Sequence, residues 1–257
     1  SQAWNIIGGY CGQVSFGHSV FFGIGAYGAG MAVVKYGLTP WPGIIIGSLL
    51  SMIVAVVISY PCFKLKGHYF AIATFAIVEI FNRLFMVWYW LNGALGLDYP
   101  MMKVGWKNFV WYRTKIPYYY GALILFVVIF SIVRFIEKNR FGYYLKAVRE
   151  DQETAEATGI NSTFIKLSAM ALSAFLASFC GAFFVQYNFR VDPPMVMSLQ
   201  VSMIFVLVTI LGGAGTLFGP LLGAMILIPL QEYTRVYWGG LGRGTDLILF
   251  GFLIVLI

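Results

Sequence analysis

Charged residues are scarce in this chain. Lysine, arginine, aspartate and glutamate together make up 11% of its 257 residues, whereas an ordinary soluble domain has roughly 25%. Hydrophobic residues make up 60% of the sequence, and the mean hydropathy is +0.82. This composition excludes a soluble globular domain and predicts a polytopic integral membrane protein.

The sequence also lacks the patterns that bind metals or nucleotides. Its 3 cysteines are far apart in apolar surroundings, with no CxxC pair and no cysteine–histidine spacing typical of zinc. No glycine is followed by lysine, so the phosphate-binding loop G-x-x-x-x-G-K-S/T is absent. Paired carboxylates and a nucleophile with a neighbouring base are missing too. We therefore expect no enzymatic activity, no metal and no cofactor in this chain.

The formal net charge is +7, but the 17 basic residues flank apolar runs instead of forming one stripe. This distribution is typical of membrane proteins whose basic residues contact anionic lipid headgroups, and it argues against nucleic-acid binding. The basic residues are divided evenly between the two sides of the expected spans. Charge alone therefore does not set the orientation.

The apolar runs are continuous over roughly 17 to 23 residues, which favours transmembrane helices over the short alternating strands of a β-barrel. The predicted fold is all-α, a single transmembrane helical bundle over residues 1–257 with about seven to eight spans. Spans are expected at 14–34, 41–63, 69–91, 116–133, 167–189 and 195–211, followed by a short span in the second part of 211–230 and, after a loop at 231–246, a last one at 247–257. Residues 1–12 are interpreted as the end of an earlier helix, so we expect the native chain to extend beyond both ends.

Residues 211–230 are too rich in glycine and proline for one regular helix. We predict a re-entrant or broken element here, which survives at membrane depth only where protein or a wet cavity surrounds it. Gly212 and Gly213 precede a Phe-Gly pair, as Gly8 and Gly9 do near the start of the chain. Two such glycine-broken segments often mark the substrate path of a transporter, although the two spacings differ by two residues.

Gln13, Ser15 and His18 lie at or near the start of a glycine-rich span. Free N–H groups and the positive end of a helix favour a carboxylate ligand there. A single histidine on an apolar helix also commonly forms a hydrogen bond between helices. Both interpretations remain open, and the three residues are candidates for a path across the membrane.

Glu79 and Arg83 are the charged residues near the middle of an expected span. Such residues are costly in lipid, so we expect Glu79 to face the interior of the bundle. Arg83 follows one helical turn later and is its natural partner. The pair is predicted either to fix helix packing or to form part of a gate or substrate contact.

The segment from Leu145 to Leu172 is charged, free of proline and helical in its pattern. Gly159 is suited to end one helix, and Asn161 or Ser162 to begin the next. The segment is either a solvated connector between two spans or a short surface helix that docks on a soluble partner.

Several stretches together resemble one family. They are GYCGQVSFGHSVFFGIGAYGAG at 9–30, FKLKGHYFAIATFAIVEI at 63–80, NGALGL at 92–97, REDQETAEATGIN at 149–161, KLSAMALSAFLASFCGAFF at 166–184 and LGGAGTLFGPLLGA at 211–224. They resemble LivM-type permease subunits of ABC importers for branched-chain amino acids, hydrophobic amino acids or amides. The resemblance covers nearly the whole chain in the family's order.

The resemblance implies that residues of about 134–166 form the cytoplasmic coupling loop that the ATPase subunits contact. Glu153 and Gly159 keep the spacing of the general importer motif, but its alanine pair is incomplete and the following Ile-x-Leu-Pro is absent. The coupling role is therefore assigned to the whole helix expected at 149–159. Its candidate contact residues are Arg149, Glu150, Asp151, Glu153, Glu156 and Gly159.

The implied assembly contains a second homologous permease subunit, two ATP-binding subunits and an extracytoplasmic substrate-binding protein in a prokaryotic inner membrane. ATP would be hydrolysed by the partner subunits. The alternative is a self-contained channel or an ion-coupled carrier for a small amphipathic solute. A carrier needs ionisable groups within the membrane, and Glu79 and Arg83 are the candidates.

Overall fold

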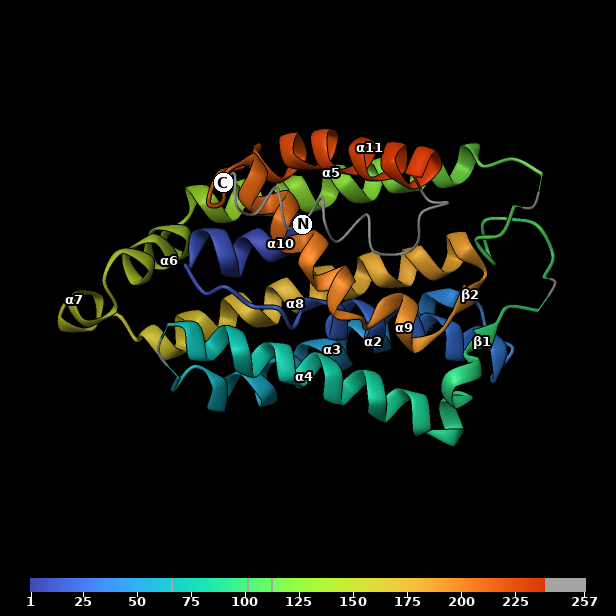
Figure 1. The fold of residues 1–257 in the computed structure, drawn as a ribbon, viewed down its shortest axis with the longest axis horizontal. Helices are drawn as coiled ribbons and strands as arrows, with labels where there is room; N and C mark the ends of the chain where they lie inside the picture. The colour runs from blue at the N-terminus through green and yellow to red at the C-terminus, as the bar shows by residue number, and fades with distance from the viewer. Residues whose placement is uncertain (66, 101, 112, 239–257) are drawn as a thin grey trace.

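The computed structural model describes residues 1–238 except 66, 101 and 112 (Figure 1). The last expected span, 247–257, lies outside the described residues. Nearly all regular structure is helical, apart from one antiparallel pair of two-residue strands, β1 (Leu97–Asp98) and β2 (Arg190–Val191). The helices are α1 (Gln2–Asn5), α2 (His18–Val34), α3 (Pro40–Cys62), α4 (His68–Val87), α5 (Ile116–Lys138), α6 (Arg140–Glu150), α7 (Gln152–Ala157), α8 (Ser162–Asn188), α9 (Pro193–Val196), α10 (Leu199–Gly212) and α11 (Gly219–Trp238), with a π-helical turn at Ile6–Tyr10 and 3-10 turns at Tyr89–Leu91 and Gly93–Leu95.

Five stretches of the described chain are long and apolar enough to cross a membrane: α3, α4, α5, α8 and the stretch Pro193–Gly212 that contains α9 and α10. The helix α2 is apolar but only 17 residues long. An all-α membrane bundle is therefore confirmed, whereas the predicted number of seven to eight spans is not.

The helix α2 begins at His18, four residues later than the sequence predicts. The preceding residues form a turn in which side-chain oxygens bind backbone N–H groups. Phe16 donates its N–H to Thr74 Oγ1 at 3.0 Å, and Gly17 donates to Ser15 Oγ at 3.1 Å. Hydropathy does not detect such a turn because the residues within it are small or apolar.

The helices α2, α3 and α8 form the centre of the bundle. Small residues let their backbones approach closely, as is common in membrane proteins: a Cβ atom on Gly28 would lie 2.7 Å from the Cα of Gly47, and one on Gly25 would collide with the carbonyl of Ser178. Serine hydroxyls bridge the same helices, for example Ser178 to Ser48 at 3.3 Å. The helices α4 and α5 lie farther out and bury smaller parts of their surfaces.

The two ends of the elongated bundle differ. The helices α6 and α7 project at one end, and the strand pair with the loop that follows α4 lies at the other (Figure 1). Aromatic side chains cluster there, where Trp106, Phe109 and Trp111 of the loop and Tyr118 at the start of α5 make edge-to-face contacts. Such a cluster is typical of a membrane–water interface. The charged segment and the aromatic loop therefore lie on opposite sides of the apolar zone.

The helical structure is interrupted between α10 and α11, as the glycine content predicts. The backbone of Gly213 has φ +102° and that of Gly215 has φ +82°, values that favour glycine. On either side of the break the two helices touch, because a Cβ atom on Gly212 would collide with the carbonyl of Gly219, and one on Gly223 with the carbonyl of Val208. The break is thus the turn of a tightly packed helical pair.

Candidate functional site

The charged segment contains two short helices, α6 and α7, instead of the single helix expected at 149–159. The chain is extended at Asp151, where φ is −155° and ψ is 115°. The carboxylate of Asp151 accepts hydrogen bonds from the backbone N–H of Glu153 at 2.8 Å and of Thr154 at 3.3 Å, and from the Thr154 hydroxyl at 3.0 Å. Asp151 therefore starts a new helix as its N-terminal cap, and the hydrogen bonds from Thr154 and Glu153 lower the pKa of its carboxyl group.

Gly159 ends α7, as the sequence predicts. Its φ is +89°, and nothing lies within 4 Å of the position that a Cβ atom would take. The N–H of Gly159 bonds to the carbonyl of Glu156 at 2.9 Å, and the N–H of Ile160 to that of Ala155 at 3.1 Å. Glycine is therefore favoured here by its backbone conformation and not by lack of space.

Arg149, in the last turn of α6, turns toward the bundle. Its guanidinium donates a hydrogen bond to the carbonyl of Gly9 at 2.8 Å. A Cβ atom on Gly12 would lie 2.9 Å from Arg149 Cγ, and one on Gly215 would collide with the Arg149 guanidinium. A residue expected to be a docking contact therefore joins α6 to two glycine-rich segments of its own chain.

Those two segments, residues 8–12 and 212–219, meet at what we call the glycine junction. Asn5, which is fully buried, accepts a hydrogen bond from the N–H of Gly215 at 2.8 Å and donates one to the carbonyl of Thr216 at 2.8 Å. Gln2 donates to the carbonyl of Leu217 at 2.8 Å. A Cβ atom on Gly9 would collide with the N–H nitrogen of Gly215. The structure therefore places side by side two segments that resemble each other in sequence, with Gly212 and Gly213 at one edge.

A second set of contacts ties α7 to the start of α8. The carboxylate of Glu156 accepts hydrogen bonds from Gln152 Nε2 at 3.0 Å and from the Ser162 hydroxyl. Lys166 donates to Gln152 Oε1 at 2.6 Å. Glu156 thus bonds within the chain although it is exposed, and Glu150 and Glu153 are exposed as well.

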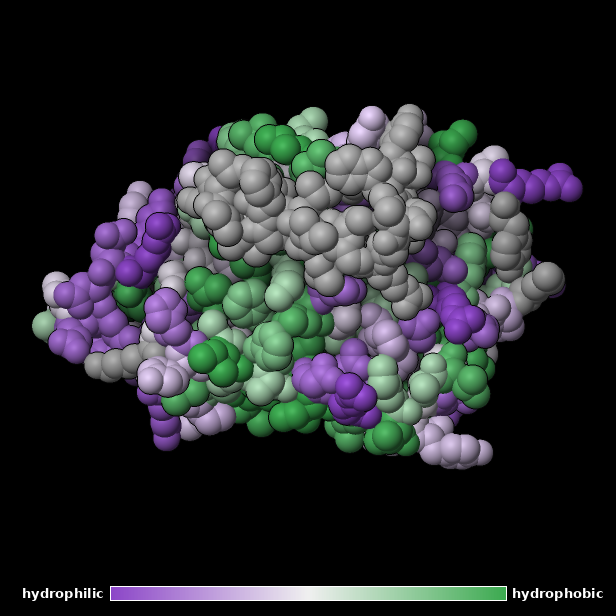
Figure 2. Space-filling view, viewed as in Figure 1, coloured by the Kyte–Doolittle hydropathy of each residue, from purple (hydrophilic) through white to green (hydrophobic). Residues whose placement is uncertain are grey.

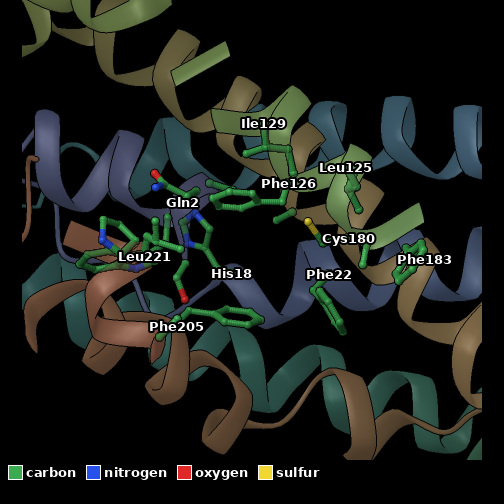
Figure 3. A pocket seen from close by; sticks show the side chains of 17 residues that line it. Gln2, His18, Phe22, Leu125, Phe126, Ile129, Cys180, Phe183, Phe205 and Leu221 are labelled. Carbon is green, nitrogen blue, oxygen red and sulfur yellow. The ribbon is translucent and has the colours of Figure 1, made fainter. Parts of the chain in front are cut away.

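A cavity of about 320 Å³ lies between α1, α2, α5, α8, α10 and α11 (Figure 3). Its volume falls at the lower end of the range for small-molecule sites. Most of its walls are apolar, and its polar lining includes Gln2 and His18. The apolar side chains include Phe22, Leu125, Phe126, Ile129, Phe183, Phe205 and Leu221.

His18 is 1% exposed, and its Nε2 lies 2.7 Å from the hydroxyl of Ser173. That hydroxyl donates to the carbonyl of Ala3, so it accepts the proton of His18 Nε2 and leaves Nδ1 as an acceptor. Within the described part of the chain, neither His18 Nδ1 nor Gln2 Oε1 has a hydrogen-bond partner. Both acceptors are buried behind the cavity surface, so the cavity offers a ligand mainly apolar walls.

The first turn of α2 has little room for a carboxylate ligand. Besides the N–H groups of Phe16 and Gly17, that of Ser19 is already bonded, to the hydroxyl of Ser202 at 3.1 Å. Ser15 is buried and serves this turn, while Gln13 is half-buried and its N–H bonds to the carbonyl of Ile7 at 3.0 Å. Of these three candidates, His18 lines the cavity.

Glu79 and Arg83 form the predicted ion pair, with 2.7 Å between Glu79 Oε1 and Arg83 Nε. The expectation that they face the interior is wrong for the described chain, because their side chains are 54% and 73% exposed. The buried polar residues of this helix are Thr74 and Asn82, and Asn82 donates to the carbonyl of Met197 at 3.1 Å. The stripe that α4 buries therefore passes through Asn82, and the charges lie on the outer surface.

Sequence reasoning missed Gln2, Asn5 and Ser173. All three are buried polar residues that bond to backbone groups far away in the sequence. Their signal is a single amide or hydroxyl residue within an apolar run, which marks a contact between helices in a membrane protein. Gln2 and Asn5 carry that signal within residues 1–12, the segment expected to be the end of an earlier helix.

Comparison with known proteins now adds to this geometry. The family model described as "Branched-chain amino acid transport system / permease component" matches residues 1–257. The chain is 27% identical over 266 residues to the high-affinity branched-chain amino acid transport system permease protein LivM of Salmonella typhimurium, and 26% identical to LivM of Escherichia coli. Each alignment covers 92% of this chain but 62% of the relative, so the chain spans somewhat less than two thirds of their length.

A more distant relative is named for a different transported substrate. The fructose import permease protein FrcC of Rhizobium meliloti is 25% identical over 112 residues, which cover 42% of this chain. No solved structure matches the chain.

Proposed function

Because the chain belongs to the family of branched-chain amino acid transport system permease components, we propose that it is the membrane-spanning subunit of an ABC importer. It moves branched-chain or related amino acids or amides inward across the prokaryotic cytoplasmic membrane. The observation that carries the proposal is the family match over residues 1–257, which we interpret as one permease domain. ATP is hydrolysed in partner subunits, because this sequence has no phosphate-binding loop.

The proposed assembly contains a second homologous permease subunit, two ATP-binding subunits and an extracytoplasmic binding protein. The α6–α7 segment, residues 140–157, is the surface that contacts an ATP-binding subunit. Its position at one end of the bundle (Figure 1) and its hydrophilic surface (Figure 2) support this assignment. Its carboxylates Glu150, Asp151, Glu153 and Glu156 are all exposed; Asp151 caps α7 and Glu156 bonds to Ser162, so Glu150 and Glu153 are the first candidates for docking contacts.

Arg149 passes the movement of this segment to the bundle. Its hydrogen bond to Gly9 and its contact with Gly215 join α6 to both sides of the glycine junction. Lys146 adds a second link, with its ammonium 5.7 Å from the centre of the Tyr10 ring. A tilt of α6 therefore displaces the junction through direct contacts, the kind of contiguous network that couples distant sites.

The junction in turn borders the cavity. Gln2 and Asn5 lie three residues apart on α1 and bond to the segment 215–217, and Gln2 also lines the cavity. The apolar walls suit the aliphatic side chain of the proposed solute. The described walls include no lysine or arginine, so a carboxylate has to be bound by groups outside this lining.

The proposal is tested by purifying the full-length protein in mild detergent and identifying each associated chain by mass spectrometry. We expect a second permease and two ATP-binding subunits, and ATP-dependent uptake of leucine or a related amide when the complex is placed in liposomes. E150K/E153K should reduce the recovery of ATP-binding subunits, whereas the control K103E/K107E, in the loop at the opposite end, should not.

Recovery of this chain alone, together with uptake driven by an ion gradient without ATP, would contradict the importer and support the ion-coupled carrier. Equal recovery of ATP-binding subunits with E150K/E153K and with the control would contradict the assignment of the docking surface while leaving the importer intact.

A further inference from the structure

The helix α4 buries one stripe and exposes the opposite one. Its buried residues are Phe70, Thr74, Val78, Asn82 and Phe85, spaced three or four apart. We call the opposite surface the α4 outer face; it contains the exposed residues Ile72, Phe75, Glu79, Ile80 and Arg83. Figure 2 shows a hydrophilic patch over the middle of α4 with hydrophobic surface around it.

The carboxylate of this patch, Glu79, lies well inside a membrane span, and Arg83 lies one turn nearer the end of the helix at Val87. The helix α4 runs from His68 to Val87 and is long and apolar enough to cross the bilayer. With a rise of 1.5 Å per residue, Glu79 is roughly 12 Å or more from either end of the helix. A carboxylate at that depth faces protein or water instead of lipid tails.

Both side chains of the ion pair have further hydrogen-bonding groups besides the two atoms that join them. Glu79 and Arg83 are joined by one contact, Nε to Oε1. Neither the guanidinium NH2 groups of Arg83 nor the second oxygen of Glu79 bonds to another residue in the described part of the chain. A guanidinium has five donors and a carboxylate about four acceptor positions. Hydrocarbon satisfies none of them, but a polar protein surface does.

The helix α5 provides the contrast, because it is even less buried than α4. Its exposed face within the span is apolar and includes Leu123, Ile124, Val127 and Val128. Its charges are confined to its last turns, at Arg134, Glu137 and Lys138. An apolar face is stable against lipid tails, so low burial alone does not require a protein partner. The charged groups of α4 do require one.

We propose that the α4 outer face packs against the second permease subunit, and that Glu79 and Arg83 make polar contacts with it inside the membrane. This inference rests on the proposed importer, since it takes its partner from that assembly. The partner surface carries hydrogen-bonding or charged side chains opposite Glu79 and Arg83. A buried contact of this kind fixes which faces of the two subunits meet.

The test places a photoreactive amino acid at Ile72 or Ile80 on α4, or at the matched positions Ile124 or Val127 on α5, in the assembled complex. Adducts formed under illumination are identified by mass spectrometry. We expect the α4 probes to label the second permease and the α5 probes to label lipid. With the second permease present, adducts of the α4 probes with lipid or with their own chain alone, or no adducts, would overturn the inference.

A charge exchange tests the role of the pair itself. E79R/R83E keeps an ion pair one turn apart but reverses the charges that the partner meets. We expect recovery of the second permease to fall by at least about tenfold, as for a buried charge contact. The control is K103E/K107E, which reverses two charges in the loop after α4, outside the spans.

Unchanged recovery with E79R/R83E would contradict the polar contact. Absence of any second permease from the complex of the unchanged chain would instead contradict the proposed function, so the two failures are distinguishable.

Discussion

The helices α6 and α7 are neighbours in the chain, and both carry charged residues, but these residues make different contacts. Arg149 of α6 reaches into the glycine junction, more than a hundred residues away in sequence from Gly9. The polar side chains of α7 bond locally, to the cap at Asp151 and to the start of α8. One helix is therefore anchored in the bundle, whereas the other is held by its nearest neighbours and presents exposed carboxylates. This division suits a segment that receives a force on α7 and passes it on through α6.

The largest effect is expected from Gly9→Ala, which breaks the anchored side. The new methyl group would collide with the Asn5 side chain and with the backbone of Gly215, so we expect a loss of about 3 kcal/mol or more. Thermal unfolding in detergent measures it. Gly17→Ala is the control, because its nearest contact is 3.4 Å away and its φ is −77°. Equal stability of the two variants would contradict the close approach at the junction.

Asn5→Ala removes the bridge between α1 and the segment 215–216. It leaves the N–H of Gly215 and the carbonyl of Thr216 without their partner, and each such group costs about 1 to 3 kcal/mol when buried. We expect a destabilisation of about 2 kcal/mol and reduced transport. A fully stable and active variant would show that the junction does not depend on Asn5.

On the α7 side, Gly159→Ala should cost about 1 kcal/mol, because an alanine is strained at φ +89° although space is open. Hydrogen exchange should show faster opening of α7, while the protection of α1 and α8 stays unchanged. Loss of protection throughout the bundle would mean that α7 is not a locally held element.

The smallest effect is expected from protonation of Asp151. Its pKa is lowered from the usual 3.8 by hydrogen bonds from Thr154 and Glu153, so the ionised form stabilises the start of α7. That stabilisation is present above pH 3.8 and is lost as the pH falls through the lowered value. Asp151→Asn should remove the pH dependence. Hydrogen exchange of the Glu153 and Thr154 N–H groups, compared between the two proteins at each pH, measures it; identical profiles would contradict the cap.

Some features of the fold could be predicted from local sequence alone. The span expected at 41–63 is observed as Pro40–Cys62, because prolines at its start and lysines after its end mark a long apolar run. Gly159 is found at the end of α7 for the same kind of local reason. The break after Gly212 follows from glycine content.

Other features depend on distant parts of the chain and could not be predicted. The direction of Arg149 is set by where the segments around Gly9 and Gly215 meet, which no local pattern encodes. The outward position of Glu79 could not be predicted from one chain by itself, in which a charge avoids lipid only by turning inward.

The most direct test of the account is Arg149→Ala in the complete importer in liposomes, with ATP hydrolysis and uptake of labelled leucine measured together. Arg140→Ala is the matched control, because Arg140 is an exposed arginine at the other end of α6, away from the glycine junction that Arg149 contacts. We predict that Arg149→Ala retains its ATP-binding subunits and hydrolyses ATP but loses most uptake, whereas Arg140→Ala transports normally. Normal uptake by Arg149→Ala would contradict the claim that α6 moves the bundle through the glycine junction.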